Sequence, residues 1–331
     1  MLSRLICGVV RSKEVLNCHV RRLQQALLFL ALIHVNPYAF AYSDLVIFGD
    51  SLSDTGNVAQ FLGEDLPFPY YENRISNGPV AVDVLADELG LSAGHSGILF
   101  FSGEGNNYAI SGANAAGSDL HDLQSQFQAF LLDTTGFLDA EALFVVMIGG
   151  NDIRDASVMA TSAESRAAVA AAVESILDVL EELLDRGAGT ILVANAPDIS
   201  KIPETSERAL QHPGLHAWAE ELSRDFNQRL QAGIEQLNVG DGADLYLYDL
   251  ISHFNAIVDQ PGAYGFSNTQ DACFEYDSYS FHPQCNFDRF VFFDSIHPTA
   301  RVHELLGLAM LEALEGTRII MAPLIHYLLT D

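Results

Sequence analysis

The sequence predicts an α/β fold in which a central parallel sheet carries helices on both faces. Short apolar runs, typical of buried strands, alternate along the chain with longer segments whose apolar residues recur at helical spacing. Strands joined by helices form parallel sheets, because a parallel connection needs a crossover. No internal repeat, low-complexity tract or clear linker interrupts residues 42–331, which favours a single domain over that range.

Five apolar runs are the candidate strands. In chain order they are Leu45–Phe48, Asn107–Ile110, Ala142–Ile148, Thr190–Ala194 and Asp244–Tyr248. The clearest helix begins after a capping box formed by Thr161 and Glu164, and Gly187 ends its apolar stripe. The other helical patterns cover about residues 78–89, 119–132, 215–237 and 299–315. The apolar segment Ile319–Leu329 is expected to dock on the domain and is too short to span a membrane.

Two long segments, residues 63–79 and 252–293, do not follow this alternation and are rich in Phe and Tyr. Loops of this length are usually functional or disordered, and the aromatic content favours order. Their side chains either form walls for an apolar substrate or pack into a core of the loops themselves. The sequence supports these two interpretations equally.

The first 41 residues are interpreted as a signal peptide. Five basic residues precede an apolar run at 26–33, and Ala39-Phe40-Ala41 matches the pattern that precedes a cleavage site. The run is too short to span a bilayer. Cleavage near Ala41 would release a secreted or periplasmic protein. The alternative is a structural N-terminal helix.

Residues 42–331 are strongly acidic. Of the 16 basic and 44 acidic residues in the chain, five and one lie in the first 41, which leaves 11 basic and 43 acidic residues and a formal net charge of −32. Such a surface repels nucleic acid and anionic membranes, so neither is an expected partner.

Two cysteines, Cys273 and Cys285, remain after residue 41. An even pair in an exported chain favours a disulfide, and the alternative is two unpaired thiols. No Cys-x-x-Cys motif or cysteine–histidine cluster has zinc spacing, so neither a metal nor a cofactor is expected.

The first predicted strand leads into a serine on a tight turn. Residues 46–57 read Val-Ile-Phe-Gly-Asp-Ser-Leu-Ser-Asp-Thr-Gly-Asn, so that Ser51 follows the end of the apolar run. Ser51 is therefore expected at the carboxyl end of the strand, the edge at which open α/β sheets bind ligands.

A candidate base lies near the end of the domain. Residues 294–298 read Asp-Ser-Ile-His-Pro, and a carboxylate three residues before a histidine can reach the imidazole Nδ1–H on one turn. Asp294 would then orient His297 as the base for Ser51. His282 is also followed by proline, but Tyr279 stands three residues before it. The other histidines after residue 41 are interpreted as surface or core residues.

Two further motifs follow predicted strands. Residues 107–114 read Asn-Tyr-Ala-Ile-Ser-Gly-Ala-Asn, and residues 149–152 read Gly-Gly-Asn-Asp. Each could be a strand-ending turn without chemistry. In this order, the four motifs resemble those of the GDSL lipolytic enzymes, or SGNH hydrolases, and in particular the branch of secreted bacterial lipases and plant esterases. The resemblance covers residues 43 to about 316.

The resemblance implies a flavodoxin-like three-layer fold and metal-free ester hydrolysis through an acyl-enzyme on Ser51. It implies an oxyanion hole made by the backbone N–H groups of Ser51 and Gly112 and the side-chain NH₂ of Asn151. Ser111 departs from the glycine that is common in this branch. Asp50 and Asp54 are expected to hold the turn by side-chain hydrogen bonds.

Two alternatives come from other classes of protein. A secreted binding protein could use an inactive hydrolase scaffold, although all the motifs are intact. A metallophosphoesterase could use Asp50, Asp54 and Asp152 in a two-metal site, but no Asp-x-His motif precedes Asp50 and no late histidines are paired. The expected substrate is a small-molecule or lipid ester, and the protein is expected to be a monomer.

Overall fold

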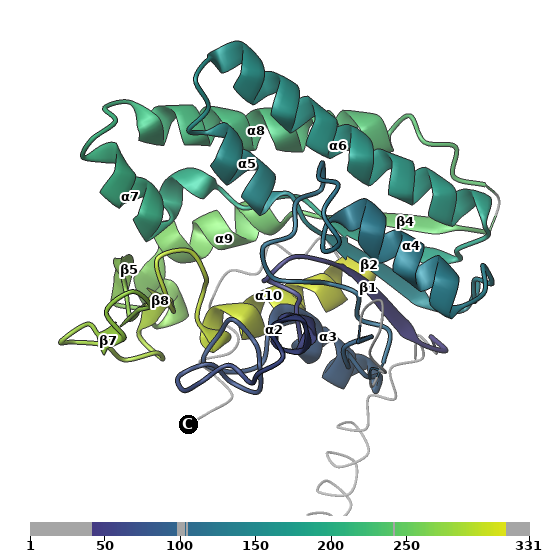
Figure 1. Ribbon diagram of the computed structural model, residues 1–331, viewed down its shortest axis with the longest axis horizontal. Coiled ribbons are helices and arrows are strands. Elements are labelled where there is room, and N and C mark those ends of the chain that lie inside the picture. The colour runs from purple at the N-terminus through teal and green to yellow at the C-terminus, as the bar shows by residue number, and fades with distance from the viewer. Residues whose placement is uncertain (1–41, 98–102, 104, 241, 316–331) are drawn as a thin grey trace, which may run out of the picture. The chain divides into compact units, whose positions relative to one another are not determined.

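Helices cover both faces of a four-stranded parallel sheet in the computed structural model, which describes residues 42–97, 103, 105–240 and 242–315 (Figure 1). The strands lie in the order β1 (Leu45–Gly49), β2 (Leu143–Met147), β3 (Thr190–Ala194) and β4 (Asp244–Tyr248). Each agrees with a predicted strand to within one residue at either end. The α/β fold with its central parallel sheet is therefore confirmed.

The fifth predicted strand, Asn107–Ile110, lies beside β1 without forming a regular strand. Asn107 makes an isolated parallel bridge with Ile47, and the N–H groups of Tyr108 and Ile110 donate to the carbonyls of Ile47 and Gly49 at 2.7 and 3.2 Å. The turn at Ser111 and Gly112 ends the pairing after this short stretch. With this segment counted, the chain follows the order 2-1-3-4-5 that is typical of flavodoxin-like sheets.

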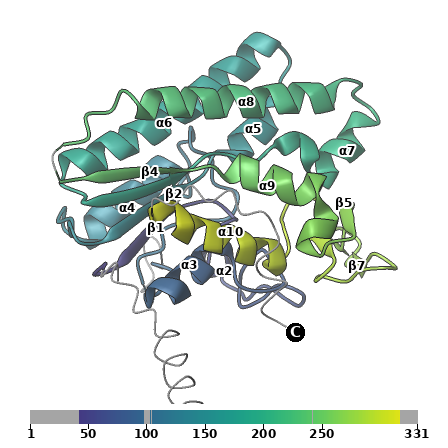
Figure 2. The ribbon, with the colours of Figure 1, turned by 180° about the vertical axis from the view of Figure 1, so that it is seen from behind.

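Helices form an outer layer on each side of the sheet (Figures 1 and 2). One layer holds α4 (Leu123–Asp133), α6 (Ser162–Asp185) and α8 (Leu215–Ile234), and the other holds α3 (Ala81–Leu89) and α10 (Ala300–Leu314). Each corresponds to a predicted helical pattern. The capping box predicted for α6 is present, because Thr161 Oγ1 accepts from the N–H of Glu164 at 3.2 Å while the N–H of Thr161 donates to Glu164 Oε2 at 3.1 Å.

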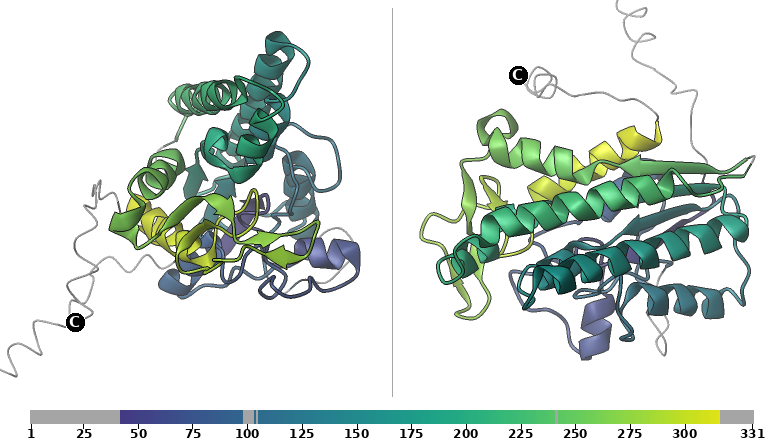
Figure 3. Two further views of the ribbon diagram at one scale, coloured as in Figure 1. Left: turned by 90° about the vertical axis from the view of Figure 1, so that its left-hand side faces the viewer. Right: turned by 90° about the horizontal axis from the view of Figure 1, so that it is seen from above.

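The remaining short elements connect these layers at the carboxyl ends of the strands. The helices are α2 (Asn57–Leu62), α5 (Gly150–Ala156), α7 (Pro203–Ala209) and α9 (Leu250–Asp259), with 3₁₀ turns at Ile199–Lys201 and Pro261–Tyr264. The short strands are β5 (Asn268–Ala272), β6 (Phe274–Glu275), β7 (Ser280–Phe281) and β8 (Phe290–Phe292). Strand β5 pairs parallel with β8, and β6 pairs antiparallel with β7. Figure 3 shows these strands at one end of the molecule.

The expectation of an irregular segment over 252–293 is thus wrong in part. Helix α9 begins at Leu250 because Asp249 caps it and accepts from the N–H of Ser252 at 3.4 Å. The helix buries Leu250, Phe254 and Ile257, which lie on one face at helical spacing.

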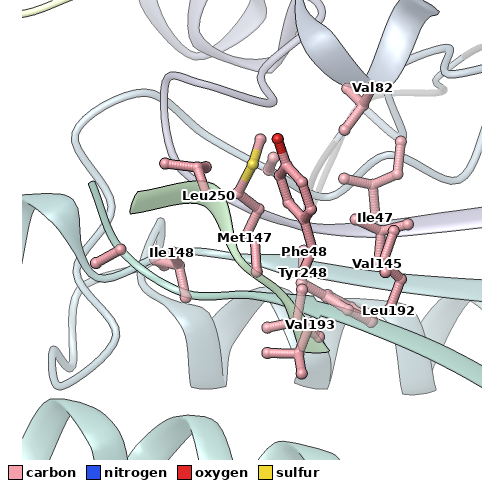
Figure 4. Close-up of a cluster of buried hydrophobic side chains, with 14 of the residues drawn as sticks. Ile47, Phe48, Val82, Val145, Met147, Ile148, Leu192, Val193, Tyr248 and Leu250 are labelled. Atoms are coloured by element: carbon pink, nitrogen blue, oxygen red, sulfur yellow. The ribbon is translucent and has the colours of Figure 1, made fainter. Parts of the chain in front are cut away.

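Apolar side chains from neighbouring strands form the core. Ile47, Val145 and Leu192 are adjacent in the strand register and point to the same face of the sheet, toward Val82 of α3 (Figure 4). All four are fully buried. On the opposite face, Phe48 packs against aromatic rings of α4. The carboxyl ends of the strands are therefore held by a rigid apolar layer on each side.

The expected disulfide between Cys273 and Cys285 is present and links residues 12 apart in the chain. The predicted signal peptide at 1–41 and the segment Ile319–Leu329 lie outside the described residues. Within the described part of the chain, none of the helices combines the length and the apolar character that a membrane crossing requires.

Candidate active site

Ser51 lies on a tight turn directly after β1. A side chain at Gly49 would come within 2.7 Å of the Met147 carbonyl, so glycine is needed for the close approach of β1 and β2 at this point. The buried side chain of Gln126 accepts from the N–H of Gly49 at 2.9 Å and donates to its carbonyl at 2.7 Å. These contacts place Ser51 at the carboxyl edge of the sheet, as the sequence predicts.

The two aspartates that flank Ser51 hold the turn. Asp50 Oδ1 accepts from the N–H of Leu52 at 3.0 Å. Asp54 accepts from three N–H groups at the start of α2 and also from the N–H and hydroxyl of Ser111, at 2.8 and 3.0 Å. Burial raises the pKa of Asp50 to about 7 and also raises the pKa of Asp54. Ser111, which departs from the common glycine, thus contributes two bonds that join its segment to the turn.

Asp294 and His297 meet on one turn between β8 and α10. Asp294 Oδ1 accepts from the backbone N–H groups of Ile296 and His297 at 2.8 and 2.7 Å. Its two oxygens lie 2.9 and 2.8 Å from His297 Nδ1. Burial alone would raise the pKa of Asp294, but the charge of His297 and these hydrogen bonds outweigh burial and lower it. Asp294 is therefore suited to remain ionised beside the imidazole.

His297 also reaches Ser51, although the two residues are 246 positions apart. His297 Nε2 lies 2.8 Å from Ser51 Oγ. Nδ1 faces a carboxylate that can accept a hydrogen bond, which favours the tautomer with the proton on Nδ1 and leaves Nε2 to accept from the hydroxyl. The structure thus brings the predicted nucleophile, base and orienting carboxylate together in one chain of contacts.

The predicted oxyanion donors lie at the ends of the neighbouring segments. Gly112 has a φ of 87°, in the region that favours glycine. Within the described residues, no acceptor is bonded to the backbone N–H of Gly112 or of Ser51. Asn151 Nδ2 donates to the carbonyl of Ala113 at 2.9 Å, which leaves the second proton of its amide unused.

Helix α5 fixes the loop that carries Gly112. The Asp152 carboxylate accepts from the N–H groups of Ala115 and Ala116 at 2.8 and 3.0 Å. Burial raises the pKa of Asp152 to about 6. Both residues of the Asn-Asp pair therefore bind the segment after Gly112, Asn151 through the amide and Asp152 through the carboxylate.

Two other histidines, His282 and His303, lie in surroundings that differ from those of His297. His282 packs against the ring of Phe290, with centroids 5.4 Å apart. His303 is buried, and its Nδ1 accepts from the N–H of Ala81 at 3.2 Å. Burial, together with the charge of His297, lowers the pKa of His303 to about 3. His303 is thus a neutral core residue, as expected.

One group of side chains in the described region has the spacing of metal ligands, namely Asp119, His121 and Asp122. Both oxygens of Asp122 already accept backbone N–H groups, from Asn114 and Asp119, at 2.8 Å each. Asp122 therefore has a structural role in the loop before α4. The aspartates of the rival two-metal interpretation, Asp50, Asp54 and Asp152, are likewise engaged by backbone N–H groups.

The two aromatic segments pack against each other beside Asp294. The ring centroids of Phe68 and Phe281 are 6.0 Å apart, and Tyr70 contacts both Phe274 and Phe293. Phe274 and Phe293 are fully buried, whereas Phe68 and Phe281 are 74% and 41% exposed. The sequence supports two interpretations of these rings, a substrate wall and a loop core. The buried rings of Phe274 and Phe293 form a loop core, whereas Phe68 and Phe281 face solvent.

Sequence reasoning did not identify Gln126, Arg154 or Glu204. Gln126 clamps Gly49, and Arg154 on α5 donates to Glu204 on α7. No local motif marks these residues, because each is a single polar residue within an ordinary helical pattern. The one available signal concerns Gln126, a glutamine that falls on the otherwise apolar face of the helix at 123–133.

Known proteins resemble this chain over much of its length. The family model "GDSL-like Lipase/Acylhydrolase" matches residues 45–310. Lipase 1 of Photorhabdus luminescens is 30% identical over 178 residues, covering 53% of this chain and 25% of that protein. The phosphatidylcholine-sterol acyltransferase of Aeromonas hydrophila is 27% identical over 242 residues, covering 71% of this chain and 66% of that protein. The chain thus spans less than two thirds of the length of either bacterial relative.

A plant relative matches over almost its whole length. A GDSL esterase/lipase of Arabidopsis thaliana is 24% identical over 331 residues, covering 87% of this chain and 95% of that protein. Among solved structures, an acetylxylan esterase from Geobacillus stearothermophilus aligns with a TM-score of 0.44 at 15% identity, over 82% of this chain and 93% of that one. Since the family model covers β1 to α10, the chain belongs to the GDSL-like lipase/acylhydrolase family.

Proposed function

We propose that this protein is a carboxylic ester hydrolase that works through an acyl-enzyme on Ser51. The observation that carries the proposal is the continuous contact from Asp294 through His297 to Ser51 Oγ. In the first step, Ser51 Oγ bonds to the carbonyl carbon while its proton moves to His297 Nε2. His297 then returns the proton to the leaving alcohol, and a water molecule repeats the attack to release the acid.

The oxyanion formed in each attack would be bound by three donors. These are the backbone N–H groups of Ser51 and Gly112 and the unused amide proton of Asn151. Donors that are held in place before the reaction stabilise the transition state without reorganisation. The contacts that hold Gly112 and Asn151 against each other through Ala113 support this assignment.

A simple assay tests the proposal against its alternatives. The protein should hydrolyse a short p-nitrophenyl ester, resist EDTA and lose activity with a serine-directed phosphonate. Loss of activity in EDTA would instead favour a metallophosphoesterase. No hydrolysis of any ester, together with no labelling by the phosphonate, would favour a binding protein on an inactive scaffold.

Replacing Asn151 with alanine is expected to lower kcat by roughly 10²–10³-fold with little change in KM, because the lost donor acts on the transition state. Steady-state kinetics on a p-nitrophenyl ester measures both constants. Asn255→Ala serves as a control, since Asn255 Oδ1 has no hydrogen-bond partner among the described residues. A change confined to KM in Asn151→Ala would assign Asn151 to substrate binding instead.

We propose a lipid-like or aryl ester as the substrate. The support comes from the aromatic rim, which we define as Phe68, Tyr276, Tyr279 and Phe281. These side chains are 74, 67, 49 and 41% exposed and belong to the segments that pack beside Asp294. Relatives named as a lipase and as a phosphatidylcholine-sterol acyltransferase also support a lipid-like ester. If an alcohol instead of water attacked the acyl-enzyme in the second step, the reaction would be an acyl transfer.

Alanine at Phe68 or Phe281 is expected to reduce kcat/KM for long-chain p-nitrophenyl esters more than for acetate, because an exposed ring near the site can cover an acyl chain. Phe274→Ala is the structural control: Phe274 is fully buried, so its loss should lower stability by about 3–5 kcal/mol. Equal losses at every chain length in the Phe68 and Phe281 variants would assign the rim to loop packing alone.

We further propose that residues 1–41 are a cleaved signal peptide and that residues 42–331 act as a single exported domain and as a monomer. The basic residues, apolar run and Ala-Phe-Ala sequence support export. The disulfide between Cys273 and Cys285 supports an oxidising compartment. N-terminal sequencing of the exported protein tests the cleavage site.

A further inference from the structure

An ion pair joins α5 to α7 beside the candidate active site. Arg154 lies one turn after Asn151 on α5, and its Nε and Nη2 donate to the two carboxylate oxygens of Glu204 at 2.6 and 3.4 Å. Forked contacts of this kind between a guanidinium and a carboxylate are strong and fix both groups in orientation. The side chains are 25% and 15% exposed, so solvent screens this pair less than a surface ion pair.

The backbone of Glu204 reaches the turn that carries the candidate base. Its N–H donates to the carbonyl of Ser295 at 2.9 Å, and Ser295 lies within the turn from Asp294 to His297. Glu204 therefore binds α5 through its side chain and the base turn through its backbone. The two contacts connect segments that are far apart in the sequence.

The other end of α5 binds the loop that carries Gly112. Asn151 donates to Ala113, and Asp152 accepts from Ala115 and Ala116. Helix α5 thus extends from the proposed oxyanion donors to Glu204. Its position decides how far those donors lie from Ser51 and His297, which are supplied by other segments.

We infer that Arg154 and Glu204 are positioning residues that hold Asn151 of α5, and with it the loop that carries Gly112, in place relative to the Asp294–His297 turn. The inference rests on the proposed function. Without the ion pair, α5 and the base turn lose a shared anchor and can shift relative to each other. Oxyanion stabilisation depends steeply on such a shift, because the donors must lie at hydrogen-bond distance from the developing charge.

Four variants test this role: Arg154→Gln, Glu204→Gln, the double variant and Arg154→Lys. We expect each Gln variant to lower kcat by roughly 10-fold with KM within about twofold, because the oxyanion donors remain in the site but are held less well in position. The double variant should be no slower than the slower single variant, because both remove one interaction. Arg154→Lys, which keeps the charge but not the fork, should recover part of kcat.

Arg208→Gln is the matched control. Arg208 Nη2 donates to Glu204 Oε1 at 2.9 Å, the oxygen that Arg154 Nη2 also contacts. Arg208 lies on α7 itself, however, four residues from Glu204. Its loss removes an ion pair of Glu204 without separating α7 from α5, so kcat should stay within about twofold of the wild type. All variants are assayed at a temperature at which circular dichroism shows them folded.

Three patterns of loss would overturn the inference: a kcat loss in Arg208→Gln as large as in Arg154→Gln, multiplicative losses in the double variant, or a loss confined to KM. These outcomes differ from failure of the proposed function. If the wild type showed no phosphonate-sensitive esterase activity, the proposed function would fall and this inference with it. If the wild type were active and the Arg154 and Glu204 variants matched it, only the positioning role would fall.

Discussion

Ser51→Ala is expected to lower kcat for ester hydrolysis by roughly 10³-fold or more while the protein stays folded. The hydroxyl is the proposed nucleophile, and among the described residues its side-chain hydrogen bond is the contact with His297. Its removal therefore deletes the acyl-enzyme route and disturbs little else. Steady-state kinetics and phosphonate labelling of the purified variant measure the effect.

Ser53→Ala is the matched control, because Ser53 lies on the same turn, is fully buried and has no partner for its hydroxyl among the described residues. This variant should keep activity within a few-fold of the wild type. If Ser51→Ala kept more than a small part of wild-type activity, or if the phosphonate still labelled it at the wild-type rate, Ser51 would not be the nucleophile.

His297→Ala is the second large effect, with an expected loss of roughly 10³-fold or more in kcat, because His297 is the one side chain in the described part of the chain that is hydrogen-bonded to Ser51 Oγ. The substitution also removes the charge and the imidazole hydrogen bond that offset the burial of Asp294, so the pKa of Asp294 should rise in this variant. The rate of phosphonate inactivation should fall together with kcat, since both reactions require activation of the hydroxyl.

His282→Ala is the control for this variant. His282 also precedes a proline, but it packs against Phe290 and accepts from the N–H of Gln284 at 3.1 Å. Its removal should leave kcat within a few-fold of the wild type. Comparable losses in the two variants would mean that His297 acts through the structure of the loop rather than as a base.

Much of the fold could be predicted because it depends on local patterns. An apolar run such as Leu143–Met147 is buried on both faces of a parallel sheet, and the capping box at Thr161 satisfies backbone groups within one turn. Helix α9 was missed because the aromatic content of its segment obscured the helical spacing of Leu250, Phe254 and Ile257. Asn107–Ile110 has the composition of a strand but pairs with β1 over too short a stretch.

The sequence by itself determined the order of the motifs, the four regular strands and the Asp294–His297 turn, because residues within one turn or one strand constrain each other through short-range hydrogen bonds and burial. Only the tertiary structure decided that His297 reaches Ser51 across 246 positions and that Glu204 links α5 to the base turn. Such contacts depend on strand order and helix packing, which bring distant segments to the same edge of the sheet. Local motifs mark Ser51 and His297 as candidates but do not place them in contact, and no local pattern marks Arg154 or Glu204, which are ordinary polar residues in their own segments.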